Sequence, residues 1–439
     1  MSYYLGLDFG TSGARAIVID PGQGILHQAQ VSHPLNISSA SCSLWQTQLD
    51  QLLQQIPHDL KGNLERIAID GTSSTVLICD GQGHPLRDAL LYNNNQAGDV
   101  LNTLKIIAPA DHVVLAATSS LAKLLWLQGQ PEFPAARYFL HQADWLGFLL
   151  HGQLGISDYH NALKLGYDPA REVYPDWFQH PVLAPLHPFL PKVVAPGTVI
   201  APISSQAATR WQINPTCAIC AGTTDSMGAF LASGATALGT AVTSLGSTLV
   251  LKLISPIPIQ ASAYGIYSHR CGDYWLVGGA SNCGGAILKE FFTDQELESL
   301  SAAINPDIPS ELDYYPLPQA GERFPIHDPD LQPRLDPKPE HPQEFLHGLL
   351  ESLARIEAQG YRLLVSLGAS PLKRVYTAGG GAKNGAWTKI RTRVLGVPVQ
   401  ASPQTEAAYG TALLALRGLA AYENLAQKLP ASPLKVLGN

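Results

Sequence analysis

The first twenty residues constrain the fold most, because they read as two apolar strands joined by a tight glycine-rich turn. Gly10 and Gly13 let the backbone turn sharply and allow another molecule to approach the main chain closely. The N–H groups of such a turn, together with the hydroxyls of Thr11 and Ser12, can bind anionic oxygens. Asp8 ends the first strand, and a carboxylate beside a phosphate needs a divalent cation between them. An ordinary hairpin with a polar turn is also consistent with these residues.

A second copy of this pattern lies in the other half of the chain. Residues 241–254 again read as strand, turn and strand, and the turn consists of Gly246, Ser247 and Thr248. A chain of 439 residues is long for one core, so two domains are expected. Two strand–glycine–hydroxyl–strand units therefore predict a duplicated α/β architecture with a phosphate chain between its halves.

Composition excludes several classes of protein. The chain is 46% hydrophobic and 14% charged with a net charge of −7, which fits a well-buried enzyme and argues against nucleic-acid or membrane partners. No signal-like segment and no membrane-length apolar run is found, so we expect a cytoplasmic protein. Cys217 and Cys220 have CxxC spacing inside an apolar strand, and we expect them to be buried and reduced. The sequence is silent on oligomeric state.

Polar residues follow several of the predicted strands, where an open α/β sheet usually holds its ligand. Residues 66–80 read as strand, small-residue turn and strand, and Ser73 lies in that turn. The amide cluster at residues 93–96 could pair with sugar hydroxyls or could simply form a loop. Asp225 follows a buried strand and precedes a helix, so a site role and a helix-capping role both remain open.

A glycine-rich turn near the C-terminus could accept a flat base. Gly380 and Gly381 leave the main chain uncovered, Asn384 could hydrogen-bond the edge of a base, and Trp387 could offer a stacking face. As a bare pattern, however, this is only a flexible turn leading into a helix.

Taken in order from about residue 4 to about 418, these stretches resemble the FGGY family of carbohydrate kinases. The resemblance extends to Asp144-Trp145-Leu146 on a predicted helix and to Ser157–Ala162, where His160 replaces the usual serine. It implies a two-domain, duplicated fold like those of actin, hexokinase and the heat-shock ATPases (ribonuclease H-like), with ATP in the interdomain cleft. We expect an N-terminal sugar-binding and catalytic domain at 1–232, completed by 406–425, and an ATP-binding domain at 233–405.

The resemblance also implies site residues, with ATP and Mg²⁺ as cofactors. Asp225 would be the base that takes the proton of the attacking hydroxyl, and its place at a helix N-terminus predicts a low pKa. Asp8 would hold Mg²⁺. The residues expected to bind sugar are Asp8, Thr11, Ser12, Gly13, Arg15, Ser73 and Asp225. Those expected to bind ATP are Thr11, Ser12, Gly246, Ser247, Thr248, Gly380, Gly381, Asn384 and Trp387.

Within the family, the chain looks most similar to a small xylulokinase-like branch that phosphorylates D-ribulose. Many xylulose kinases carry Met-His just after the glycine that matches Gly71, whereas this chain has Thr72-Ser73. Residues 92–96 likewise replace a Trp-x-Asp-x-Arg segment. We therefore predict a D-ribulose kinase. The alternatives are a D-xylulose kinase and a catalytically idle, ATP-dependent sugar sensor, and the presence of both Asp8 and Asp225 favours an enzyme.

Overall fold

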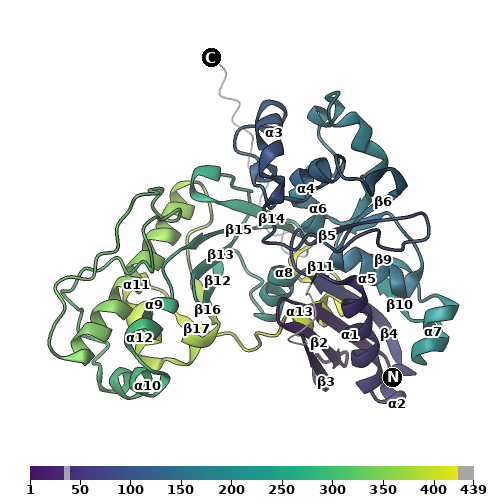
Figure 1. Cartoon of the computed structure of the whole chain (residues 1–439). Coiled ribbons are helices and arrows are strands. Elements are labelled where there is room, and N and C mark those ends of the chain that lie inside the picture. Colours follow the sequence, from purple (N-terminus) through teal and green to yellow (C-terminus); the bar gives the residue numbers. More distant parts are fainter. Residues whose placement is uncertain (34–39, 424–439) are drawn as a thin grey trace, which may run out of the picture.

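The computed structural model describes residues 1–33 and 40–423, and Figure 1 shows them as two α/β lobes side by side. The sheet of the N-terminal lobe has the order β3-β2-β1-β4-β10-β9, and β11 also pairs with β4. Its strands are β1 (Tyr3–Phe9), β2 (Gly13–Ile19), β3 (Ile25–Ser32), β4 (Leu64–Gly71), β9 (Val199–Pro202), β10 (Ala218–Cys220) and β11 (Thr223–Thr224).

The sheet of the C-terminal lobe repeats this plan. Its order is β14-β15-β13-β12-β16-β17. In both sheets an antiparallel hairpin is followed by another antiparallel strand on one side and a parallel strand on the other. The predicted duplication is therefore confirmed. The strands are β12 (Thr240–Leu245), β13 (Leu249–Ser255), β14 (Tyr267–Cys271), β15 (Tyr274–Ser281), β16 (Arg374–Ala378) and β17 (Val399–Ala401).

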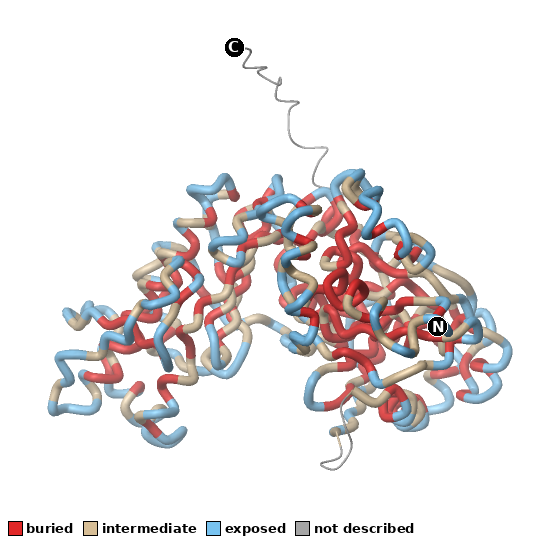
Figure 2. Tube along the Cα trace, turned by 45° about the horizontal axis from the view of Figure 1, so that its top comes forward, coloured by how far each residue is buried: buried red, intermediate tan, exposed pale blue. Residues whose placement is uncertain are grey.

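Helices cover both sheets, and Figure 2 shows buried residues gathered inside each lobe. The longer helices of the N-terminal lobe are α1 (Cys42–Gln55), α3 (Leu101–Ile107), α4 (Ser120–Leu127), α5 (Gln142–His151), α7 (Ser205–Trp211) and α8 (Asp225–Ala232). Short helices are α2 (His58–Lys61), α6 (Tyr159–Ala162) and α14 (Ala420–Glu423), and short strands are β5 (Val76–Cys79), β6 (Tyr138–His141), β7 (Ile156–Asp158) and β8 (Lys192–Val194). The C-terminal lobe has α9 (Ala286–Phe291), α10 (Asp294–Ala303), α11 (Pro342–Ser366) and α12 (Gly385–Leu395).

The chain returns to the first lobe at its end. Figure 1 shows the segment after β17 crossing back to α13 (Ala407–Arg417), which lies against β1. Gly6 of β1 makes this contact possible, since a Cβ at that position would clash with the carbonyl of Ala408. Gly410 permits an equally close contact with Gly228 of α8. Residues 424 and 425, which the predicted domain boundary includes, lie outside the described residues.

Two predictions from the sequence, on membrane-spanning helices and on the cysteine pair, can be compared with this fold. In residues 1–33 and 40–423, no helix combines the length and the apolar character needed to cross a bilayer. Cys217 and Cys220 are buried and free of disulfides, as are the other four cysteines of the chain, so the CxxC spacing makes no disulfide.

Candidate active site

The first predicted phosphate turn lies between β1 and β2 and presents its polar groups to solvent. The N–H of Gly10 donates to the carbonyl of Gly13 at 3.0 Å, which closes the turn. Thr11 and Ser12 are both exposed. Gly13 has a φ of +153°, and a Cβ there would clash with the carbonyl of Val31, so a side chain is excluded. The turn therefore offers two hydroxyls at an edge that the main chain keeps open.

The second predicted turn, between β12 and β13, has the same construction. The N–H of Gly246 donates to the carbonyl of Thr248 at 3.2 Å, and Ser247 and Thr248 are exposed. Two further glycines press against this turn from the segment after β15. A Cβ on Gly284 would clash with the carbonyl of Ser247, and Gly285 donates its N–H to Gly246 O at 2.8 Å. Both lobes thus contribute one open glycine–hydroxyl turn.

Carboxylates gather at the neighbouring strand ends of the first sheet. Asp8 of β1 pairs in register with Asp70 of β4, and Asp70 with Thr223 of β11. Asp8 is 4% exposed, and the guanidinium of Arg15 lies 3.5 Å from it. Burial raises the pKa of Asp8. Asp70 is fully buried, and burial together with the nearby Asp8 charge raises its pKa well above the usual range. Of the two carboxyls, Asp70 is therefore the one that favours its protonated form, and it accepts a hydrogen bond from Thr411.

Asp225 is the first residue of α8 and is half-buried. The N-cap is Thr224, and Asp225 instead accepts the N–H of Ser226 at 2.6 Å, so the capping alternative does not describe its geometry. Burial raises the pKa of Asp225 to about 6, and the charge of Asp8 adds to this rise. The expectation of a low pKa from the helix dipole was wrong, because loss of hydration outweighs the favourable end of a two-turn helix.

The two segments that depart from the usual xylulose-kinase pattern lie next to each other. Ser73 is the least buried residue of the turn after β4, and its hydroxyl makes no hydrogen bond within the described part of the chain. The ammonium of Lys123, which is fully buried on α4, donates to the carbonyl of Ser74 at 2.8 Å and to that of Leu91 at 2.6 Å. One side chain therefore ties the Ser73 turn to the loop that carries the amide cluster at residues 93–96.

A cleft of about 820 Å³ opens between the two lobes. On the first lobe it is lined by Ser226, which adjoins Asp225, and on the second by Val250 and Lys252 of β13. Neither glycine–hydroxyl turn is part of this lining. The cleft thus extends from the Asp225 end of the site along the sheet of the C-terminal lobe.

The predicted adenosine turn is only partly available for a ligand. Gly380 is exposed and nothing lies within 4 Å of a Cβ built on it. Asn384 is the N-cap of α12: its oxygen accepts the N–H of Trp387 at 2.9 Å, and its amide nitrogen donates to Ser301 at 2.8 Å. Gly381 is pressed against the Trp387 ring.

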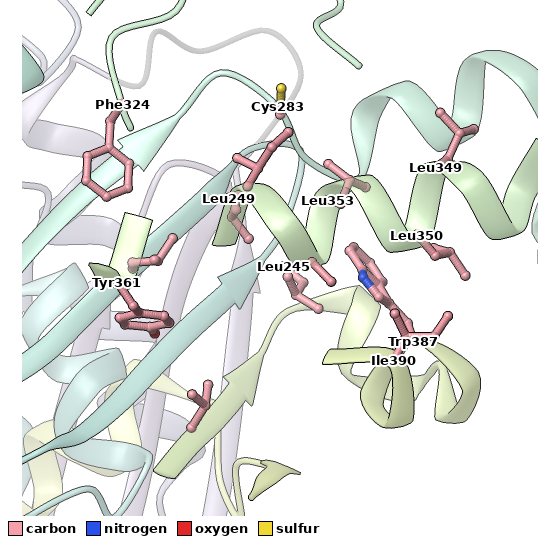
Figure 3. Close-up of a cluster of buried hydrophobic side chains, with 14 of the residues drawn as sticks. Leu245, Leu249, Cys283, Phe324, Leu349, Leu350, Leu353, Tyr361, Trp387 and Ile390 are labelled. Carbon is pink, nitrogen blue, oxygen red and sulfur yellow. The ribbon is translucent and has the colours of Figure 1, made fainter. Parts of the chain in front are cut away.

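The expectation that Trp387 offers a stacking face was wrong. Its side chain is 3% exposed and lies in the core of the C-terminal lobe. Figure 3 shows it among the aliphatic side chains of Leu245, Leu353, Leu350 and Ile390. An indole buries a large apolar area, and this gain keeps its faces inside the lobe rather than toward a ligand.

Comparison with known proteins identifies the family. The model of the N-terminal domain of the FGGY family of carbohydrate kinases matches residues 3–232, and that of the C-terminal domain matches residues 235–419. The chain belongs to the FGGY family of carbohydrate kinases. It is therefore an ATP-dependent sugar kinase, and the predicted resemblance is confirmed.

Individual relatives of this kinase are distant. A xylulose kinase of Staphylococcus xylosus is 20% identical over 95% of this chain and 91% of its own. A gluconokinase of Bacillus subtilis (strain 168) is 21% identical over 90% of this chain and 83% of its own. The crystal structure of a ligand-bound xylulose kinase from Lactobacillus acidophilus has the same fold, with a TM-score of 0.81, 16% identity, and coverage of 96% of this chain and 90% of that one.

Sequence reasoning did not single out three charged residues of this kinase site. Lys123 and Lys252 each interrupt a run of apolar residues in a helix or strand, and Asp70 ends the apolar run of β4. Charged side chains are rarely buried without a partner or a function. That interruption was the signal that could have found all three.

Proposed function

We propose that this kinase transfers the γ-phosphoryl group of ATP to D-ribulose and forms D-ribulose 5-phosphate. The observation that carries the proposal is the Ser73 hydroxyl, which makes no hydrogen bond in the described residues and lies in a turn that Lys123 ties to the amide loop. D-ribulose and D-xylulose differ in configuration at C3 alone. A site built to hydrogen-bond one epimer leaves polar groups unpaired with the other. Many xylulose kinases have a histidine where this chain has Ser73, so the group available to hydrogen-bond the sugar here is a hydroxyl instead of an imidazole.

The chemistry that we propose needs one base and two phosphate turns. The Asp225 carboxylate takes the proton of the attacking hydroxyl as the new O–P bond forms and the bond between the γ-phosphorus and its bridging oxygen breaks, and ADP leaves. With a pKa of about 6, Asp225 is ionised at neutral pH and is more basic than an ordinary aspartate. The Thr11–Ser12 and Gly246–Thr248 turns hold the phosphates from the two lobes, and the Gly380–Asn384 turn contacts the adenosine through the open main chain at Gly380.

Asp8 fits a magnesium site of the kind that carries few protein ligands. Within the described residues, no group of three or more acidic, histidine or cysteine side chains is arranged to hold a metal. Mg²⁺ bound to nucleotides needs only one or two carboxylates, since water and phosphates complete its shell. The buried Asp8 would supply that ligand, and the ion would neutralise phosphate charge. We also propose that the N-terminal lobe, 1–232 with 406–425, carries sugar and base, and that 233–405 carries the adenosine.

D-xylulose is the second candidate substrate, because several relatives that match most of this chain are xylulose kinases. The two sugars are compared by a coupled ADP-release assay on one preparation, with kcat/KM measured for each. We expect D-ribulose to be preferred about 10²-fold or more. The Asp225→Asn variant gives the background rate of ADP release in this assay. A preference for D-xylulose or glycerol would contradict the assignment, and a protein that binds sugar but releases no ADP with any would be the idle sensor.

A further inference from the structure

One face of the C-terminal sheet forms a floor for the interdomain cleft. Along β13, Leu249, Leu251 and Leu253 point into the core, so Val250 and Lys252 point to the opposite face, which lines the cleft. Residues of β15 and β14 that pair with Val250 or Lys252 therefore lie on the same, cleft-facing side of the sheet.

The register places Lys252 beside an unfilled position. Lys252 pairs with Gly278 of β15, and Gly278 pairs with Tyr267 of β14, so the three form one row across the floor. A Cβ on Gly278 would clash with the carbonyl of Leu251 and would approach the Cγ atom of Lys252 to 3.4 Å. The glycine thus keeps a gap open between the lysine and the tyrosine.

A second lysine approaches Tyr267 from the other lobe. Lys164, in the short helical segment after α6, lies with its ammonium 5.4 Å from the centre of the Tyr267 ring. Neither Lys164 nor Lys252 has a carboxylate within 4 Å in the described residues. The ammonium of Lys252 donates only to the carbonyl of Ser226, at 2.6 Å. Burial lowers the pKa of Lys252 to about 8; the charge of Asp225 opposes this shift, and that of Lys164 adds to it.

The surroundings favour an anion with more than one charge. Arg323 and Lys105 also line the cleft, while its only acidic lining residue, within the described chain, is Asp111, which accepts a hydrogen bond from Ser262. Two lysines that form no ion pair within the described residues, with Asp225 as the nearby acidic charge, suit the dianion of a phosphate monoester better than a single carboxylate. Lys252 hydrogen-bonds the carbonyl of Ser226, the residue next to Asp225. The transferred phosphate would lie near Asp225 at the end of the reaction.

We propose that Lys252 and Lys164 form a phosphate subsite over Gly278 that holds a sugar phosphate, the product class of this kinase. The identity of the sugar rests on the proposed function, whereas the phosphate subsite does not. Because the two lysines come from different lobes, a phosphate between them joins the lobes and slows release of product. Removal of either ammonium should weaken binding of the phosphate group and leave the neutral sugar unaffected.

The test is calorimetric titration of the full-length protein, without nucleotide, with D-ribulose 5-phosphate and separately with inorganic phosphate. We expect Lys252→Met and Lys164→Met each to weaken binding of D-ribulose 5-phosphate at least about tenfold, since hydrogen bonds to charged groups contribute about that much. Lys105→Met removes the same charge at the exposed rim and serves as the matched control, with binding within about twofold of wild type. Lys252→Arg should restore most of the affinity.

The outcomes separate this proposal from the assignment of the sugar. If the kinase phosphorylates another pentulose, the inorganic phosphate arm still reads the subsite, and a loss in both lysine variants supports it. Wild-type protein that binds neither probe overturns the proposal. The proposal is also overturned if the Lys164→Met and Lys252→Met variants bind as wild type does. It is overturned too if Lys105→Met loses as much affinity, since that would indicate a general positive electrostatic field rather than a site.

Discussion

Replacing Asp225 with asparagine should stabilise the folded kinase at alkaline pH while it removes activity. Burial raises the pKa of this carboxyl from 3.8 to about 6. The shift of about two units corresponds to a penalty of about 3 kcal/mol for holding the ionised group in the folded state, as an upper value. Asparagine removes the charge and keeps an oxygen that can accept the N–H of Ser226. The variant should therefore unfold with a higher free energy than wild type at pH 8, by up to about 3 kcal/mol.

The pH dependence fixes the sign of this effect. Because the folded-state pKa is raised, the folded protein binds the proton more tightly than the unfolded chain does. The penalty is absent below the unfolded pKa of 3.8 and complete above about 6. The gain of Asp225→Asn should thus fall to about half at pH 5.

Urea denaturation at the two pH values measures the gain, and the coupled assay should show at least a hundredfold loss of kcat. Asp99→Asn, at an exposed position, is the control and should change neither quantity. Equal stability of Asp225→Asn and wild type at pH 8, or a difference that does not narrow at pH 5, would refute the reasoning. Sugar phosphorylation at a tenth of the wild-type rate or more would show that Asp225 is not the base.

Three other substitutions test separate parts of the site. Asp8→Ala should abolish turnover without rescue by added Mg²⁺, and Thr11→Ala should cost less; normal Mg²⁺ dependence in Asp8→Ala would contradict a metal role. Trp387→Ala should lower the free energy of unfolding by about 3–5 kcal/mol, because it empties a core position. Wild-type stability with a raised KM for ATP would instead indicate ligand stacking. Lys123→Met should raise the KM for sugar about tenfold and leave that for ATP unchanged, because two carbonyls lose their donor; an equal change in both would mean a general loss of structure.

The sequence by itself determined the repeated elements of the fold. Apolar alternation around a glycine turn is a local property, so both hairpins could be recognised in isolation and their repetition predicted the duplicated sheet. The long helix α11 is also encoded locally, because its apolar stripe repeats over many turns. The ordered set of short motifs indicated the family, which the comparisons confirmed.

Tertiary structure alone decided which side chains are buried and which charges meet. Trp387 follows a glycine turn in a pattern that suits stacking, yet neighbours from β12 and α11 enclose its ring. The pKa of Asp225 depends on burial and on Asp8, more than two hundred residues away in the sequence. Lys164 and Lys252 meet only because the two lobes face each other. Burial and electrostatic fields are sums over neighbours that come from distant segments, and no local pattern in the sequence encodes that sum.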